Sequence, residues 1–272
     1  MTVPRILIIA GSDSGGGAGI QADIKTVTML GGHAMTAITA LTAQNTLGVG
    51  GVMPVPAEFV LKQIDTVVSD IGVDSVKIGM IGAAETAQAV AERLETLHVP
   101  IVFDPVMVTS SGSTLADPAT VAVFDRLLSI SAVATPNIPE LEALAGMTIG
   151  HAPDRDRAVE QVMDRTGCRA LLAKGGHLFT ADGEVHDVLY ASGHDEHHWS
   201  SQRIDTRHDH GTGCTLASGI ATGLGRGEGL VEAISRAREY VRAAMLAAPS
   251  FGEGHGPMGH GLGGVPFEKI HS

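Results

Sequence analysis

The sequence predicts an α/β fold in which a mostly parallel central sheet is covered by helices on both faces. Short apolar segments alternate with segments whose apolar residues recur at helical spacing, which is the pattern of strands that alternate with amphipathic helices. The apolar segments contain few polar residues, as expected of strands buried on both faces. Polar residues follow several of these segments directly, where open parallel sheets bind their ligands.

Six short apolar segments are predicted strands, and four periodic segments are predicted helices. The strands cover residues 6–10, 34–40, 75–78, 101–103, 132–134 and 170–173, and the helices cover 57–70, 84–97, 211–224 and 230–247. Short alternating stretches within 176–203 predict an antiparallel hairpin. No linker-like composition separates it from the rest, so one domain over 1–272 is expected, with a glycine-rich loop at 251–264 packed near the site.

Composition argues against several classes of function. The formal net charge of −12, from 30 acidic and 18 basic residues, would repel a nucleic-acid backbone. No run of 18 or more apolar residues predicts a membrane helix, and the first apolar run is too short for the core of a signal peptide. The two cysteines, Cys168 and Cys214, are expected to be reduced thiols in the cytoplasm.

The segment His210-Gly211-Thr212-Gly213-Cys214 predicts an anion-binding turn. Its two glycines precede a predicted helix, whose first backbone N–H groups and dipole favour a bound anion. The alternative is an ordinary glycine-rich start of a helix. A helix N-terminus of this kind can lower the pKa of a thiol such as that of Cys214.

The glycine-rich turn at 11–19 follows the first predicted strand. Its glycine spacing does not match a dinucleotide-binding fingerprint, and the P-loop pattern with Gly-Lys-Ser/Thr is absent from the sequence. An oxidoreductase is therefore the least favoured class. The turn is better suited to letting the backbone approach a small substrate than to binding a dinucleotide.

Polar residues follow three further strands and could bind phosphate and metal. Asp104 and Lys174 each follow a predicted strand, and Asn137 and Glu140 are spaced to share the first turn of a helix, where they could hold Mg²⁺ waters and phosphate. The alternative for Asn137 and Glu140 is a capping box alone. Lys174 could instead be an exposed lysine that enters a turn. Gln44 offers an amide donor and acceptor to an aminopyrimidine or pyridine edge, or is an ordinary loop residue.

Four other residues receive structural interpretations. His194, His197 and His198 lack the spacing of a zinc site and are expected in a solvated loop. Cys168 is expected to be buried.

The combination of these motifs resembles the hydroxymethylpyrimidine/phosphomethylpyrimidine kinases of thiamine biosynthesis, which belong to the ribokinase-like superfamily. The resemblance runs from Ile8 to about His260. It is carried by residues 11–22, 77–80, 104–107, 135–140, 174–177, 210–215 and 254–257.

The resemblance implies a ribokinase-like three-layer fold with a small β flap, usually as a homodimer, and the use of ATP with Mg²⁺. It assigns Gln44, Gly11, Asp23, Met80 and Val106 to the pyrimidine substrate, and Asp104, Asn137, Glu140, Lys174 and Arg238 to the nucleotide, with Asp104 and Glu140 at the metal. The resemblance assigns catalysis to Gly211, Thr212, Gly213, Cys214 and Lys174. Cys214 stands where sugar-kinase relatives have a catalytic aspartate.

The sequence departs from the family pattern at two positions. Ser110, in the flap segment 108–112, stands where a lysine is common, and Arg238 stands where a lysine is common near the nucleotide. Two other functions remain open. One is a pyridoxal kinase on the same scaffold, and the other is a pyrimidine-binding module without turnover. The set Asn137, Glu140, Lys174 and Cys214 argues against the second, because binding alone needs no phosphoryl-transfer apparatus.

Overall fold

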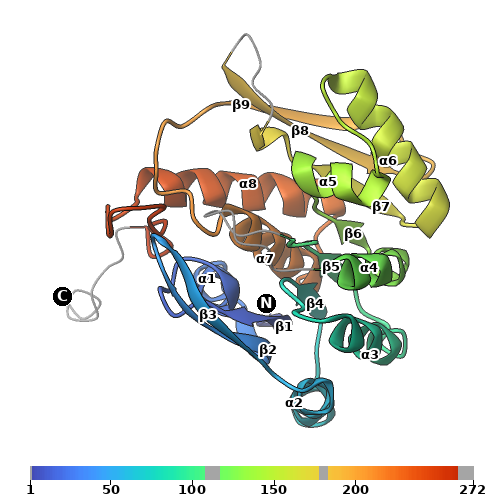
Figure 1. Cartoon of the computed structure of the whole chain (residues 1–272), viewed down its shortest axis with the longest axis vertical. Coiled ribbons are helices and arrows are strands. Elements are labelled where there is room, and N and C mark those ends of the chain that lie inside the picture. The colour runs from blue at the N-terminus through green and yellow to red at the C-terminus, as the bar shows by residue number, and fades with distance from the viewer. Residues whose placement is uncertain (1, 108–116, 178–182, 263–272) are drawn as a thin grey trace.

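The computed structural model describes residues 2–107, 117–177 and 183–262 (Figure 1). Ser110 and its flap segment lie outside these ranges. The strands are β1 (Arg5–Ser12), β2 (His33–Asn45), β3 (Gly48–Pro54), β4 (Ser75–Ile78), β5 (Ile101–Phe103), β6 (Val133–Ala134), β7 (Ala170–Ala173), β8 (Glu184–Ala191) and β9 (His197–Gln202). The helices are α1 (Gly19–Met29), α2 (Ala57–Asp70), α3 (Ala84–Leu94), α4 (Pro118–Ile130), α5 (Ile138–Ala145), α6 (Ala152–Thr166), α7 (Thr212–Gly225) and α8 (Leu230–Leu246).

The nine strands form one sheet in the order β3-β2-β1-β4-β5-β6-β7-β8-β9. The six central strands, from β2 to β7, pair in parallel. Antiparallel strands extend both edges, with β3 beside β2 and the β8–β9 hairpin beside β7. The predicted parallel sheet and its antiparallel hairpin are therefore confirmed.

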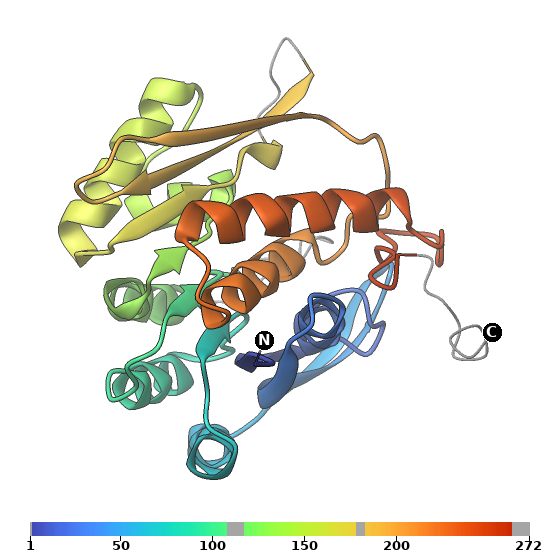
Figure 2. The ribbon, with the colours of Figure 1, turned by 180° about the vertical axis from the view of Figure 1, so that it is seen from behind.

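Helices cover both faces of the sheet, and alternate residues of β1 face the two layers. Ile6 and Ile8 pack in a core with residues of α1, α7 and α8. Leu7 and Ile9 pack in a second core with residues of α2, α3, α4, α5 and α6. Figure 2, seen from behind, shows α7 and α8 stacked over one face, as the predicted three-layer arrangement requires.

The predicted elements are present, with differences at their ends. The strand predicted at 34–40 continues to Asn45, because antiparallel pairing with β3 prolongs its hydrogen-bonded ladder beyond the apolar residues. Gln44 therefore lies on a strand and not in a loop. His197 and His198, expected in a loop, begin β9. Cys168 is buried, as predicted. The helix predicted at 84–97 ends at Leu94, although Leu97 still packs against the core.

One fully buried ion pair joins three elements below the carboxyl ends of the strands. The ammonium of Lys77 on β4 lies 3.0 and 2.9 Å from the two carboxylate oxygens of Asp23 on α1, and both side chains have 0% exposure. Ser218 on α7 donates a hydrogen bond to the same carboxylate over 2.7 Å. The substrate-binding role that the resemblance implies for Asp23 is therefore not a direct contact, because the carboxylate is fully enclosed and already paired.

This pair predicts a large stability loss when one partner is removed. Lys77→Met leaves a buried carboxylate without its cation, so the free energy of unfolding should fall by roughly 3–5 kcal/mol. The double variant Lys77→Met/Asp23→Asn should recover much of that loss, because it removes both charges and keeps an acceptor for Ser218. Chemical denaturation of the single and double variants measures the coupling. Additive losses would contradict the pairing as the source of stability.

Candidate active site

A cavity of about 1270 Å³ opens at the carboxyl ends of the parallel strands. Of the fourteen predicted site residues, twelve line it: Gln44, Met80, Val106, Asp104, Asn137, Glu140, Lys174, Gly211, Thr212, Gly213, Cys214 and Arg238. Residues from both ends of the sequence and from its middle therefore meet in one space. The two others, Asp23 and Gly11, lie behind the wall.

Gly11 lies under the side chain of Met80. A Cβ atom at position 11 would collide with the Met80 methyl group, so a larger residue there would displace this side chain from the end of β1. Met80 itself lines the cavity, as predicted. Gly11 therefore supports the wall of the site rather than forming its surface.

The predicted anion-binding turn opens α7. Gly211 is the N-cap and has a φ of 89°, a left-handed conformation that favours glycine, and any side chain there would collide with the carbonyl oxygen of Gly17. A Cβ atom at Gly213 would lie 3.2 Å from the ammonium of Lys174 and 3.4 Å from Asp104 Oδ2. The first turn of a 14-residue helix thus lies directly against a cation, where a phosphoryl group would be stabilised from both sides.

Lys174 is held between two carboxylates. Its ammonium lies 2.9 Å from Asp104 Oδ1 and 3.8 Å from Glu140 Oε2. Burial disfavours the charge of Lys174, but Asp104 and Glu140 outweigh burial and raise its pKa. Lys174 is therefore a cation at neutral pH and is not the exposed turn residue of the alternative interpretation.

Asn137 and Glu140 form a capping box at the start of α5. The Asn137 side chain accepts from the Glu140 N–H over 2.9 Å, and the Glu140 carboxylate accepts from the Asn137 N–H over 2.8 Å. Both residues also line the cavity, so capping does not exclude a role toward a ligand. Burial, with the nearby charge of Asp104, raises the pKa of Glu140 to about 7, against the opposing effect of Lys174.

Asp104 and Glu140 are better suited to holding a hydrated Mg²⁺ ion than to binding a metal ion through protein ligands alone. Among the described residues no three His, Cys, Asp or Glu side chains come together as a metal cluster. Within the described part of the chain, the polar contacts of these two carboxylates use Asp104 Oδ1 and Glu140 Oε2, which leaves Asp104 Oδ2 and Glu140 Oε1 for other ligands. Mg²⁺ commonly binds through one or two carboxylates, waters and phosphate oxygens, so the residues fit this ion.

The pKa of Cys214 is raised, although a helix N-terminus can lower the pKa of a thiol. Burial raises the pKa of this thiol to about 11, and the nearby charge of Lys77 offsets only part of that rise. Cys214 is therefore a neutral thiol at physiological pH.

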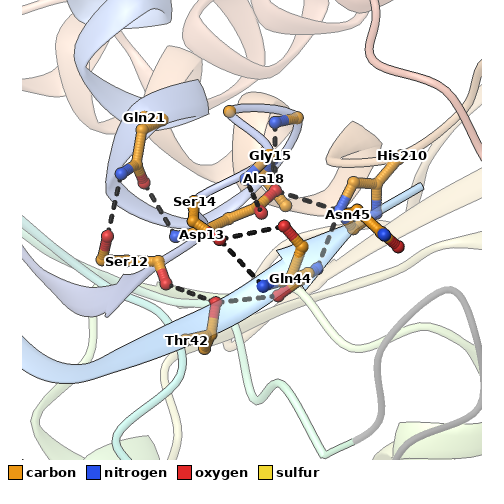
Figure 3. A network of polar contacts seen from close by, with 12 residues as sticks. Ser12, Asp13, Ser14, Gly15, Ala18, Gln21, Thr42, Gln44, Asn45 and His210 are labelled. Carbon is orange, nitrogen blue, oxygen red and sulfur yellow. Dashed lines mark hydrogen bonds and ion pairs between the residues drawn. The ribbon is translucent and has the colours of Figure 1, made fainter. Parts of the chain in front are cut away.

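At the other end of the cavity Gln44 belongs to a polar network that sequence reasoning missed (Figure 3). Its side-chain amide lies 3.0 Å from His210 Nε2, which in turn lies 3.1 Å from Asp13 Oδ2. Asp13 and His210 both line the cavity. Both occur within segments identified above, the turn at 11–19 and the motif at 210–214, but nothing in the sequence indicated that they meet.

Arg238 contributes to the cavity wall from α8. Its guanidinium donates to Asp187 Oδ2 over 2.8 Å and lies 5.8 Å from the centre of the Trp199 ring. Asp187 also accepts from the N–H of Gly175, which follows Lys174. The arginine is thus anchored to the β8–β9 hairpin.

These features define a class of protein. A parallel sheet whose carboxyl ends hold a lysine between carboxylates, facing the glycine turn of a helix, provides the charge-stabilising groups that phosphoryl transfer requires. The amide network at the opposite end offers directional contacts to a small polar molecule. Fold and site together are those of a small-molecule kinase.

Comparisons with known proteins agree. The chain belongs to the phosphomethylpyrimidine kinase family, whose model matches residues 13–259. It is 47% identical over 262 residues to a hydroxymethylpyrimidine/phosphomethylpyrimidine kinase of Streptomyces coelicolor, covering 96% of each chain. It is 49% identical over 257 residues to a thiamine biosynthesis bifunctional protein of Geobacter sulfurreducens, covering 94% of this chain but only 52% of that longer protein.

The fold is shared with solved structures. A Bacillus subtilis pyridoxal kinase in complex with ADP superposes with a TM-score of 0.87 at 30% identity, over 97% of this chain and 100% of that one. The ribokinase-like fold is thereby confirmed. No helix among the described residues is both long and apolar enough to cross a bilayer.

The raised pKa of Cys214 predicts slow alkylation. At pH 7.5 a thiol with a pKa of about 11 is ionised to about 0.03%, against about 10% for an unperturbed cysteine. Iodoacetamide should therefore label Cys214 roughly tenfold or more slowly than free cysteine, after allowance for the higher nucleophilicity of the more basic thiolate. The rate, followed by mass spectrometry, should still be rising at pH 10. Cys214→Ala identifies the labelled residue, and a rate that levels off below pH 8.5 would refute the raised pKa.

Proposed function

We propose that this chain transfers the γ-phosphoryl group of ATP to 4-amino-5-hydroxymethyl-2-methylpyrimidine, to its monophosphate, or to both. One observation carries the proposal: a single cavity is lined at one end by Gln44 and at the other by Lys174 and the turn at 211–214. The first suits the edge of an aminopyrimidine, and the second suits a phosphoryl group. The printed function of the Streptomyces coelicolor relative supports this pairing.

The residues act mainly through position and charge. The hydroxymethyl oxygen attacks the γ-phosphorus, and the bond to the bridging oxygen of ADP breaks with its electron pair left on ADP. The hydroxyl proton passes to an oxygen of the transferred phosphoryl group, while Lys174 and the N–H groups of the 211–214 turn stabilise the charge on that group. Phosphoryl transfer passes through a loose transition state that needs little prior removal of a proton. Cys214 then places the acceptor oxygen against the turn and does not act as a base, since it is a neutral thiol at physiological pH.

Asp104 and Glu140 would hold Mg²⁺ together with the nucleotide phosphates. When bound, the ion neutralises phosphate charge and orients the leaving group. Asn137 and Arg238 complete the nucleotide side, and Met80 and Val106 face the ring. A single domain, homodimer assembly and a cytoplasmic location stay predictions.

The alternative function is phosphorylation of pyridoxal, which the superposition on the Bacillus subtilis pyridoxal kinase favours. The two functions separate in one experiment. ADP release is measured with hydroxymethylpyrimidine, with its monophosphate and with pyridoxal at equal concentrations. We expect the highest kcat/KM with a pyrimidine, and a higher value with pyridoxal would reverse the order of the two proposals.

The raised pKa of Glu140 predicts a magnesium requirement that depends on pH. Below about pH 7 the carboxyl group holds its proton and loses its charge, so the Mg²⁺ concentration for half-maximal rate should rise as the pH falls from 8 to 6. Glu140→Gln keeps a side chain that can complete the capping box but lacks the charge. It should need more Mg²⁺ at every pH, with little pH dependence.

Glu142→Gln, on the same helix but outside the cavity lining, is the matched control. It should keep the metal dependence of the unsubstituted protein. If Glu140→Gln instead lowers the melting temperature and leaves the metal dependence normal, Glu140 is a capping residue only.

A further inference from the structure

Asp13 is a fixed acceptor at the substrate end of the cavity (Figure 3). Its Oδ1 accepts from the Gly15 N–H over 2.8 Å, and its Oδ2 accepts from the N–H groups of Gly17 and Ala18 over 3.0 and 2.8 Å. Burial disfavours the charge, but the hydrogen bond with His210 and the backbone donors outweigh burial and lower the pKa of Asp13. The side chain is therefore an ionised carboxylate, which accepts and cannot donate.

The ring of His210 is held against this carboxylate. A Cβ atom at Gly17 would lie 2.6 Å from His210 Cδ2, so the ring edge lies directly on the Gly17 backbone, and Gly256 accepts from the His210 backbone N–H. His210 Nε2 lies 3.1 Å from Asp13 Oδ2. Because the carboxylate can only accept, His210 Nε2 must carry the proton.

The proton on His210 Nε2 determines whether the oxygen or the NH₂ group of the Gln44 amide faces it. The amide end of Gln44 that is drawn as nitrogen in Figure 3 lies 3.0 Å from the same Nε2. A protonated Nε2 carries a single hydrogen and no lone pair, so Asp13 Oδ2 and the Gln44 amide must share that hydrogen. The amide oxygen can share it as an acceptor, whereas the amide NH₂ cannot. Amide oxygen and nitrogen have nearly the same shape, and the hydrogen-bond network decides which occupies each position. The oxygen of Gln44 therefore belongs on the His210 side.

Thr42 leads to the same orientation independently. Its hydroxyl has one hydrogen, and the Ser12 carbonyl oxygen, 2.8 Å away, can only accept it. The other end of the Gln44 amide, drawn as oxygen in Figure 3, lies 3.3 Å from the same hydroxyl oxygen. That hydroxyl now offers only lone pairs, because its hydrogen is used by Ser12. That end must be the NH₂ group.

We propose that Asp13 and His210 are positioning residues that fix the polarity of the Gln44 amide and so select a 4-aminopyrimidine over its 4-oxo analogue. This inference rests on the proposed function. An aminopyrimidine edge offers an N–H donor beside a ring-nitrogen acceptor, whereas the oxo analogue offers an oxygen acceptor beside a ring N–H donor. An amide whose orientation is fixed can pair with only one of these two arrangements of donor and acceptor.

The first test compares the dissociation constants of the two pyrimidines. For the unsubstituted protein, calorimetry should give tighter binding of the amino compound. His210→Phe removes the donor that holds the amide oxygen, so the amide can rotate and the ratio of the two constants should fall by roughly 10- to 100-fold. His255→Phe is the matched control, because His255 also lines the cavity but pairs with Asp209 and does not contact Gln44. It should leave the ratio unchanged, and an unchanged ratio in His210→Phe overturns the proposal.

The second test does not depend on turnover or on the binding of a pyrimidine. The ¹⁵N spectrum of the imidazoles of the full, unsubstituted chain, with the His210 signal identified by its loss in His210→Phe, reports which ring nitrogens are protonated. A proton on Nε2 is expected, and a bare Nε2 overturns the proposal. If no pyrimidine is phosphorylated, the proposed function fails while this spectrum still decides whether Asp13 and His210 set the polarity.

Discussion

The buried pair of Lys77 and Asp23 is the constraint on which the active site depends. Neither side chain is exposed, and the pair joins β4 to α1, while Ser218 ties it to α7. Separating two charges in such surroundings leaves each without compensation, so the three elements are held in one relative position. That position places the N-terminus of α7 over the ends of the central strands, where the turn at 211–214 meets Lys174. The pair therefore orients the anion-binding turn.

Buried charges are also paired at the phosphate end of the cavity, but there they do not balance. Lys174 lies between two carboxylates, so this cluster carries a net negative charge whenever Glu140 is ionised. A polyphosphate approaching alone would meet that charge. Asp104 and Glu140 could hold a divalent cation together with the phosphates, and its charge would remove the conflict. The raised pKa of Glu140 has the same origin, since burial and the charge of Asp104 both oppose the ionisation of Glu140.

The sequence allowed most of the central sheet to be predicted, because buried parallel strands are short, apolar and followed by polar residues. It did not reveal β3, whose glycine-rich segment has no alternating pattern and is defined by pairing with β2. Twelve predicted site residues line the cavity, but Asp23 does not, since a motif shows that a residue belongs near a site and not which way it points. The contact between Asp13 and His210 joins residues 197 positions apart, and only the fold brings them together.

Two carboxylates of one cavity have opposite pKa shifts, and the reason separates their roles. Asp13 receives three backbone N–H bonds and an imidazole, which outweigh burial and lower its pKa. Glu140 receives one backbone N–H bond and has Asp104 nearby, so burial prevails and its pKa rises. Because Asp13 stays charged, it is always a hydrogen-bond acceptor, which suits it to orienting the donor and acceptor groups around a neutral ring. A carboxylate that titrates near neutrality gains most from a cation, which suits it to a site that must bind and release a charged ligand.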